Sequence, residues 1–166
     1  MQKQHLIGIW IISFLTLILS TQIQAATPSR IALISQVNGA SYATDLAIQQ
    51  HLQTAGYQVQ IVDQTQDPRQ IKNTDLVILS STVGSKNLKV GWRQLEIPLM
   101  TWESDYIDDL AMTGKKTGTD FGEVEKSRYL WLVNAPHPLA AQLPAGTINA
   151  YQKQATMDWG KPGLGA

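Results

Sequence analysis

The chain has 166 residues, of which 43% are hydrophobic and 16% are charged, with 13 basic and 13 acidic side chains. That length fits one domain, and the apolar fraction is large enough for a packed core. A formal net charge of zero excludes the strongly basic surface that nucleic-acid binding needs. Because the sequence has no cysteine, disulfides, thiolate nucleophiles and cysteine-bound metal centres are excluded.

Residues 1–25 are typical of a secretory signal peptide. Lys3 supplies a positive charge, an apolar run covers residues 6–19, and Ala25 places a small residue before the expected cut. The run matches the core of a signal, about 7–15 residues, and is shorter than the roughly 20 residues of a membrane-spanning helix. We therefore expect an exported protein, periplasmic or secreted, with no membrane attachment after cleavage. An uncleaved N-terminal anchor is the alternative.

Two strands and a helix are expected at the start of the mature domain, residues 26–166. The apolar run 31–34 predicts a buried strand. The turn signal Asn38-Gly39 follows, and apolar spacing then predicts a helix over 41–55. Residues 57–62 alternate between apolar and polar, which is typical of a half-exposed strand.

Strands and helices continue to follow each other further along the chain. Asp67-Pro68 is typical of a helix start and predicts a short helix to about residue 73. The apolar runs 76–79 and 98–102 predict two more buried strands. A helix is expected over 104–112, capped by its first residues.

Alternating strands and helices predict parallel strands with crossover helices. We therefore expect an α/β fold with an open, mostly parallel, doubly wound sheet of the flavodoxin-like kind. In the strand order 2-1-3-4-5 of such sheets the second strand lies at the edge, which fits the pattern of residues 57–62.

The last third of the chain has a different pattern. Residues 114–122 are loop-like, and strand candidates at 127–133 and 147–151 predict an antiparallel addition to the sheet. Glycine and proline are frequent in 157–166, so no closing strand or helix is expected there.

Five segments in this order resemble a known domain: 75–83, 97–103, 108–114, 137–141 and 159–162. They are similar to an uncharacterised domain of secreted bacterial proteins, near the trehalose-utilisation (ThuA-like) domains of the class I glutamine amidotransferase-like fold group. The resemblance implies the same open α/β sheet. Enzymes of that group use a cysteine nucleophile, which this chain lacks, so their chemistry is not carried over.

The family domain continues past the Trp-Gly-x-Pro segment with further strands and a last helix. By this resemblance the chain is a C-terminally shortened member that lacks its final strand and helix. A bare apolar patch on the sheet would then be covered by a protein partner or by self-association.

Polar side chains follow the predicted parallel strands at their carboxyl ends, where open α/β sheets bind ligands. The same residue types also cap helices and form turns. The candidate ligand-binding residues are Asn38, Ser41, Ser80, Ser81, Thr82, Ser85, Glu103 and Asp105.

Glu103 and His137 are the candidate catalytic residues. Glu103 follows a buried strand, and burial would raise its pKa and suit it to acid–base chemistry. With Asp105, Asp108 and Asp109 it could instead form an oxygen-rich cation site or complement a helix dipole. His137 lies between two prolines and could equally fix a rigid turn. No metal-spaced histidine pair and no serine elbow are present, so no metal site is predicted.

Two further features bear on ligands. The loop over 36–41 lacks the hydroxyl groups expected of a phosphate cradle, so no flavin or other cofactor is expected. Trp92 and Trp159 lie in loop-like sequence and could present a ring to a sugar.

We therefore expect an exported, non-catalytic ligand-binding or interaction domain for a small molecule or carbohydrate. The alternative is a hydrolase-like enzyme using Glu103 and His137 with a water molecule or metal ion.

Overall fold

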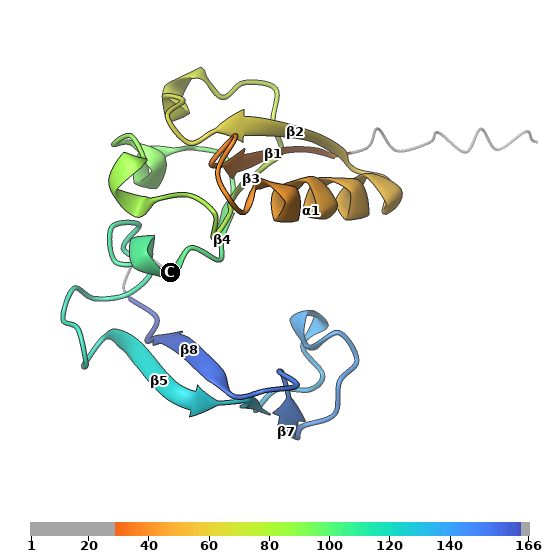
Figure 1. The fold of residues 1–166 in the computed structure, drawn as a ribbon, viewed down its shortest axis with the longest axis vertical. Coiled ribbons are helices and arrows are strands. Elements are labelled where there is room, and N and C mark those ends of the chain that lie inside the picture. Colours follow the sequence, from red (N-terminus) through yellow and green to blue (C-terminus); the bar gives the residue numbers. More distant parts are fainter. Residues whose placement is uncertain (1–28, 164–166) are drawn as a thin grey trace, which may run out of the picture.

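The computed structural model describes residues 29–163, so the predicted export signal lies outside the described residues. Four parallel strands form the central sheet in the order β2-β1-β3-β4 (Figure 1). The strands are β1 Arg30–Ser35, β2 Gln58–Asp63, β3 Leu76–Leu79 and β4 Leu99–Thr101. The predicted parallel α/β sheet is thereby confirmed, with β2 at the edge as its alternating sequence indicated.

The central strands are buried on both faces of the sheet. Ile31 and Leu33 of β1 point to the face that α1 (Tyr42–Thr54) covers. Ala32 and Ile34 point to the opposite face, where turns and loops supply the covering side chains. Because neither face of β1 meets water, its sequence is a continuous apolar run rather than an alternating one.

Helix content is lower than the sequence predicts, and α1 is the one α-helix within residues 29–163. The prediction of α-helices over 68–73 and 104–112 is wrong. Each of these segments begins with a single 3-10 turn, η1 Pro68–Gln70 and η4 Ser104–Tyr106. The chain leaves η1 because Ile71 is extended and buried in the core. No helix of the described part is long and apolar enough to cross a membrane.

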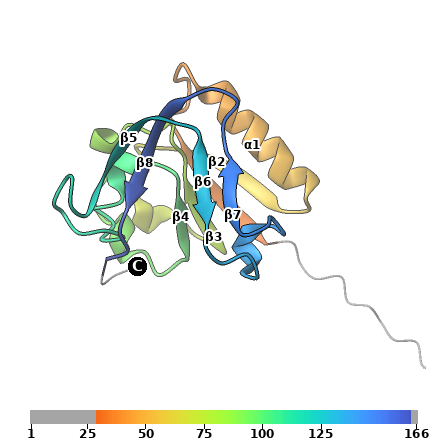
Figure 2. The same ribbon diagram turned by 90° about the horizontal axis from the view of Figure 1, so that it is seen from below.

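A two-stranded antiparallel arm, here named the β-ribbon, follows the sheet (Figure 2). Its inner half pairs β5 (Phe121–Ser127) with β8 (Ala155–Gly160), and its outer half pairs β6 (Tyr129–Leu132) with β7 (Gly146–Asn149). The predicted strands at 127–133 and 147–151 are confirmed as the antiparallel pair β6 and β7. The expectation that they extend the central sheet is wrong, because this pair forms a sheet of its own.

The expectation that residues 157–166 hold no strand is wrong for the part that forms β8. Met157 and Trp159 pair with Val124 and Gly122, which are distant in sequence. The two strands approach closely at Gly122, since a Cβ there would lie 3.0 Å from the Trp159 ring and would displace it. Pairing with β5 therefore overrides the local signal of the tail.

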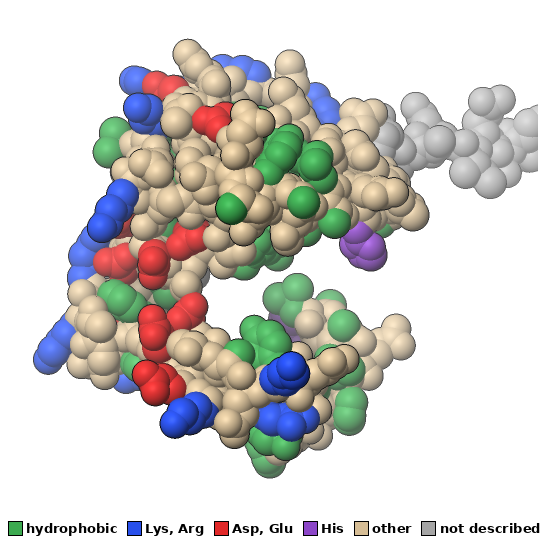
Figure 3. All heavy atoms as spheres, viewed as in Figure 1, with side chains coloured by type: hydrophobic (Ala, Val, Ile, Leu, Met, Phe, Trp, Pro, Cys, Tyr) green, Lys and Arg blue, Asp and Glu red, His purple; other side chains and the backbone are tan. Residues whose placement is uncertain are grey.

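The sheet and the β-ribbon lie on opposite sides of an open cleft. Figure 1 shows them joined at one end by the segment between β4 and β5. Figure 3 shows the molecular surface hollowed between the two parts. Two of the surface pockets open along this cleft, one at the exit of β4 and one between α1 and β4.

Candidate functional site

A buried carboxylate joins three elements at the carboxyl ends of β1 and β3. Asp45, in the first turn of α1, is fully buried. Its oxygens accept hydrogen bonds from the hydroxyl groups of Ser35, Ser80 and Thr82, with Ser80 Oγ 2.5 Å from Oδ1. The strand order reverses between β1 and β3, which is where open α/β sheets bind ligands.

Two of the predicted ligand residues are engaged inside this cluster. Ser80 is fully buried, so its hydroxyl faces Asp45 and not solvent. Thr82 Oγ1 donates to Asp45 and accepts a hydrogen bond of 3.4 Å from the backbone N–H of Gln36. The cluster therefore ties the loops after β1 and β3 to the helix.

Four other predicted ligand residues lie on the connecting loops. Asn38 occupies the turn before α1 with a φ of 65°, and Ser41 precedes the helix without a side-chain cap. Ser81 is exposed, and Ser85 begins the 3-10 turn η2 (Ser85–Asn87). None of the four lines the pocket that contains Asp105.

Glu103 and Asp105 lie together where the chain leaves β4. Thr101 Oγ1 bonds the Leu79 carbonyl and accepts the Glu103 backbone N–H at 2.9 Å. The Glu103 carboxylate accepts the Asp105 backbone N–H at 3.1 Å and so caps η4. These local bonds hold Glu103, which is 7% exposed, at the end of β4.

Burial raises the pKa of Glu103 above its usual range, as expected from its place in the sequence. The Asp105 N–H partly offsets this by stabilising the charged form, while the negative charges of Asp105 and Asp158 raise the pKa further. Glu103 is therefore electrostatically linked to the side chains of the neighbouring pocket.

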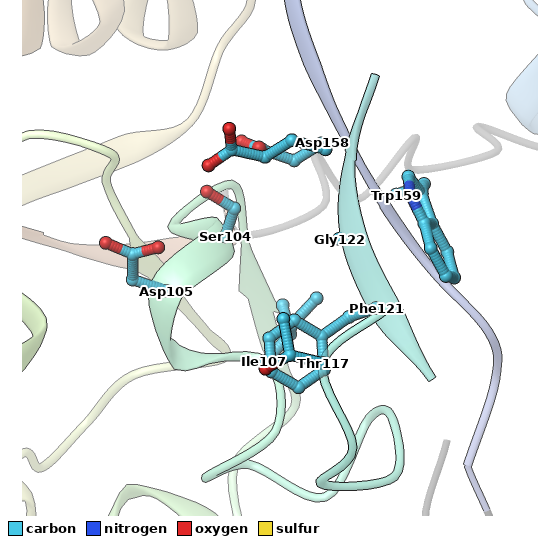
Figure 4. Close-up of a pocket in the computed structure, with 9 residues that line it drawn as sticks. Ser104, Asp105, Ile107, Thr117, Phe121, Gly122, Asp158 and Trp159 are labelled. Atoms are coloured by element: carbon cyan, nitrogen blue, oxygen red, sulfur yellow. The ribbon is translucent and has the colours of Figure 1, made fainter. Parts of the chain in front are cut away.

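That pocket has a volume of about 300 Å³ and lies between η4 and the inner half of the β-ribbon (Figure 4). Ser104, Asp105 and Asp158 present oxygen atoms at one end, and Ile107 and Phe121 form an apolar end with the nearby Thr117. The full lining is Ser104, Asp105, Ile107, Thr117, Phe121, Gly122, Glu123, Asp158 and Trp159.

Like charges face each other across the β-ribbon in this pocket. Glu123 and Asp158 are direct cross-strand partners in the β5–β8 register. A pair of like charges in that position destabilises a sheet. Among the salt bridges formed by residues 29–163, none reaches Glu123, Asp158, Glu103 or Asp105. The pocket therefore favours a ligand that brings hydrogen-bond donors or positive charge.

The oxygen-rich cation site considered for Glu103, Asp105, Asp108 and Asp109 is not assembled in the described part of the chain. Within it, no group of three or more histidine, aspartate or glutamate side chains is arranged to hold a metal ion. Lys115 instead bonds Asp109 at 2.9 Å and lies 3.9 Å from Asp108.

No hydrogen bond joins Glu103 to His137 among the described residues, and each makes a local bond of its own. His137 precedes the 3-10 turn η5 (Pro138–Ala140), and its Nδ1 accepts the Leu139 backbone N–H at 3.2 Å. η5 lies beside β7 at the outer end of the β-ribbon, whereas η4 lies at the exit of β4 (Figure 1). The local bond of His137 is the turn-fixing role that its flanking prolines indicated.

The two tryptophans considered for sugar binding have different environments. Trp92 is 1% exposed and belongs to the core, so it cannot present its ring to a ligand. Trp159 is among the residues that line the pocket at the exit of β4, but its ring lies on the other side of β5 from Asp158 (Figure 4). The Lys161 ammonium is 5.9 Å from the centroid of that ring.

Sequence reasoning missed several residues of both sites. Asp45 stands three residues before Ile48 and seven before Leu52, so helical spacing would have placed it on the buried face. Phe121, Glu123 and Asp158 enter their pocket through the pairing of β5 with β8, and no local pattern signals that pairing.

Comparison of this chain with protein-family models, with curated proteins and with solved structures finds no match.

Proposed function

We propose that this protein is an exported, non-catalytic binding domain whose sheet belongs to the class I glutamine amidotransferase-like group. The parallel order β2-β1-β3-β4 supports the group, and the lack of cysteine speaks against the catalysis of its enzymes. Export is supported by the charged, apolar and small-residue pattern of residues 1–25.

We further propose that the pocket at the exit of β4 binds a carbohydrate. The observation that carries this is the like-charged pair Glu123 and Asp158, set beside an apolar end formed with Phe121. Carboxylates accept hydrogen bonds from sugar hydroxyl groups, and apolar rings pack on the sugar face. Because none of the salt bridges within residues 29–163 reaches these carboxylates, a sugar that carries an amine is expected to bind more tightly than a neutral one.

Calorimetric titration of the purified protein with glucosamine, glucose and N-acetylglucosamine tests the proposal. Glucosamine should bind most tightly, and Asp158→Asn should weaken its binding about 10-fold or more, the effect of losing a charged hydrogen bond. The same variant should be at least as stable as the wild type, because it relieves the repulsion with Glu123.

Glu96→Gln is the matched control, since Glu96 is exposed and lies outside the pocket. It should leave the affinity unchanged. Failure of all three sugars to bind, or equal binding by Asp158→Asn, would overturn the carbohydrate proposal.

A further inference from the structure

A second pocket, separate from the one at the exit of β4, lies where the residues after β8 pack on the segment 111–114. Its volume is about 630 Å³, within the range of small-molecule sites, about 300–1,000 Å³. Arg93, in the 3-10 turn η3 (Trp92–Gln94), and Lys161, directly after β8, both line it. The full lining is Arg93, Ala111, Thr113, Gly114, Asp120, Lys161, Pro162 and Gly163.

Backbone hydrogen bonds between distant segments fix the walls of this pocket. The Lys161 N–H donates to the Asp120 carbonyl, and the Gly163 N–H donates to the Met112 carbonyl, each at 2.7 Å. Gly163 packs so closely that a Cβ there would lie 3.0 Å from the backbone of Thr113. Tertiary packing therefore builds the pocket, and its shape does not depend on a single loop.

Arg93 and Lys161 bring two positive charges to the pocket, and both side chains are exposed enough to reach a ligand. Neither takes part in a salt bridge within residues 29–163. The charge of Arg93 also acts on Lys115: Asp109 raises the pKa of that lysine, and repulsion from Arg93 offsets part of the rise. An anion bound beside Arg93 would relieve this repulsion.

The carboxylates near these cations make other contacts. Asp120 Oδ2 accepts the backbone N–H of Lys116 at 2.9 Å, and the same carboxylate packs against Gly114. Lys115 bonds Asp109 at 2.9 Å and lies 3.9 Å from Asp108. The described lining therefore holds two positive charges against the one negative charge of Asp120. Figure 3 shows lysine and arginine side chains along the edge of the molecule where the sheet and the β-ribbon join.

We propose that this pocket binds a small organic anion, with Arg93 and Lys161 holding its carboxylate or phosphate group. A guanidinium group donates two parallel hydrogen bonds to either group, and an ammonium group adds a further charged donor. The volume leaves room for the organic part of the ligand beside its charged group. The pocket shares no lining residue with the proposed carbohydrate site, so the inference goes beyond the proposed function.

Calorimetric titration of the purified protein with citrate and with glycerol phosphate tests the proposal. At least one probe should bind with a Kd of about 1 mM or tighter, and the tighter probe shows which anionic group is preferred. Arg93→Gln and Lys161→Gln should each weaken this binding about 10-fold, because each removes a charged hydrogen bond. Raising the salt concentration to about 0.5 M should weaken it as well, since both cations are exposed.

Lys153→Gln is the matched control, because Lys153 is exposed and lies outside the pocket. It should leave the affinity for the probe unchanged, and Asp158→Asn should also retain the binding. The proposal is overturned if neither probe binds at about 10 mM, or if both Arg93→Gln and Lys161→Gln bind as the wild type does. Loss of probe binding in Asp158→Asn would overturn it too, because the anion would then depend on the pocket at the exit of β4.

Discussion

Glu103 makes the stability of the protein depend on pH in a definite direction. Its pKa in the folded protein lies above its ordinary value of 4.5 because burial disfavours the carboxylate. Between those two pKa values the folded state holds more protons than the unfolded state, so the free energy of unfolding falls as pH rises through this window.

We expect Glu103→Gln to remove this loss of stability. The free energy of unfolding of the variant relative to the wild type should therefore increase from pH 4 to pH 7, as measured by urea denaturation at both values. Glu96→Gln, an exposed substitution of the same kind, should show no such increase. If the difference in unfolding free energy between Glu103→Gln and the wild type stays constant from pH 4 to pH 7, burial does not raise the pKa of Glu103.

Single residues were predictable where their signal is local. The place of Glu103 directly after an apolar run predicted both its burial and its raised pKa. The positions of Glu123 and Asp158 opposite each other depend on the strand register, which the sequence of either strand does not specify.

At the scale of elements, Asp45 is the attachment of α1 to the carboxyl ends of β1 and β3. Asp45→Ala leaves the buried hydroxyl groups of Ser35 and Ser80 without their acceptor. We expect this variant to lose about 2–5 kcal/mol of unfolding free energy, measured by urea denaturation. Gln50→Ala, an exposed change on the same helix, should stay within about 0.5 kcal/mol. A loss that small for Asp45→Ala would show that the cluster is not a structural attachment.

The strands that were predicted correctly are those whose burial is visible as a pattern of apolar residues. The continuous apolar runs of β1 and β3 and the alternation of β2 predicted the parallel sheet and its edge. The helices over 68–73 and 104–112 were predicted from their starts, but no amphipathic face sustains them beyond one turn. β8 forms although glycine and proline are frequent in this segment, because β5 supplies its hydrogen-bonding partner.

At the scale of the whole molecule, the proposed export predicts a shortened chain. The apolar core of residues 6–19 has the length of a signal and not of a membrane-spanning helix, so cleavage should follow Ala25. Mass spectrometry of the protein from the cell envelope or medium should therefore find Ala26 at the N-terminus. Recovery of chains that begin at Met1 or Gln2 would contradict this prediction and favour the uncleaved anchor.

The pairing of β5 with β8 also sets an order of assembly. All four strands of the central sheet lie between residues 30 and 101, whereas the β-ribbon closes with β8 at residue 160. A chain that crosses a membrane N-terminus first therefore delivers the complete sheet before the last strand of the ribbon emerges. We therefore expect the sheet to fold while β5 and β6 still lack their partners, and the ribbon to form last.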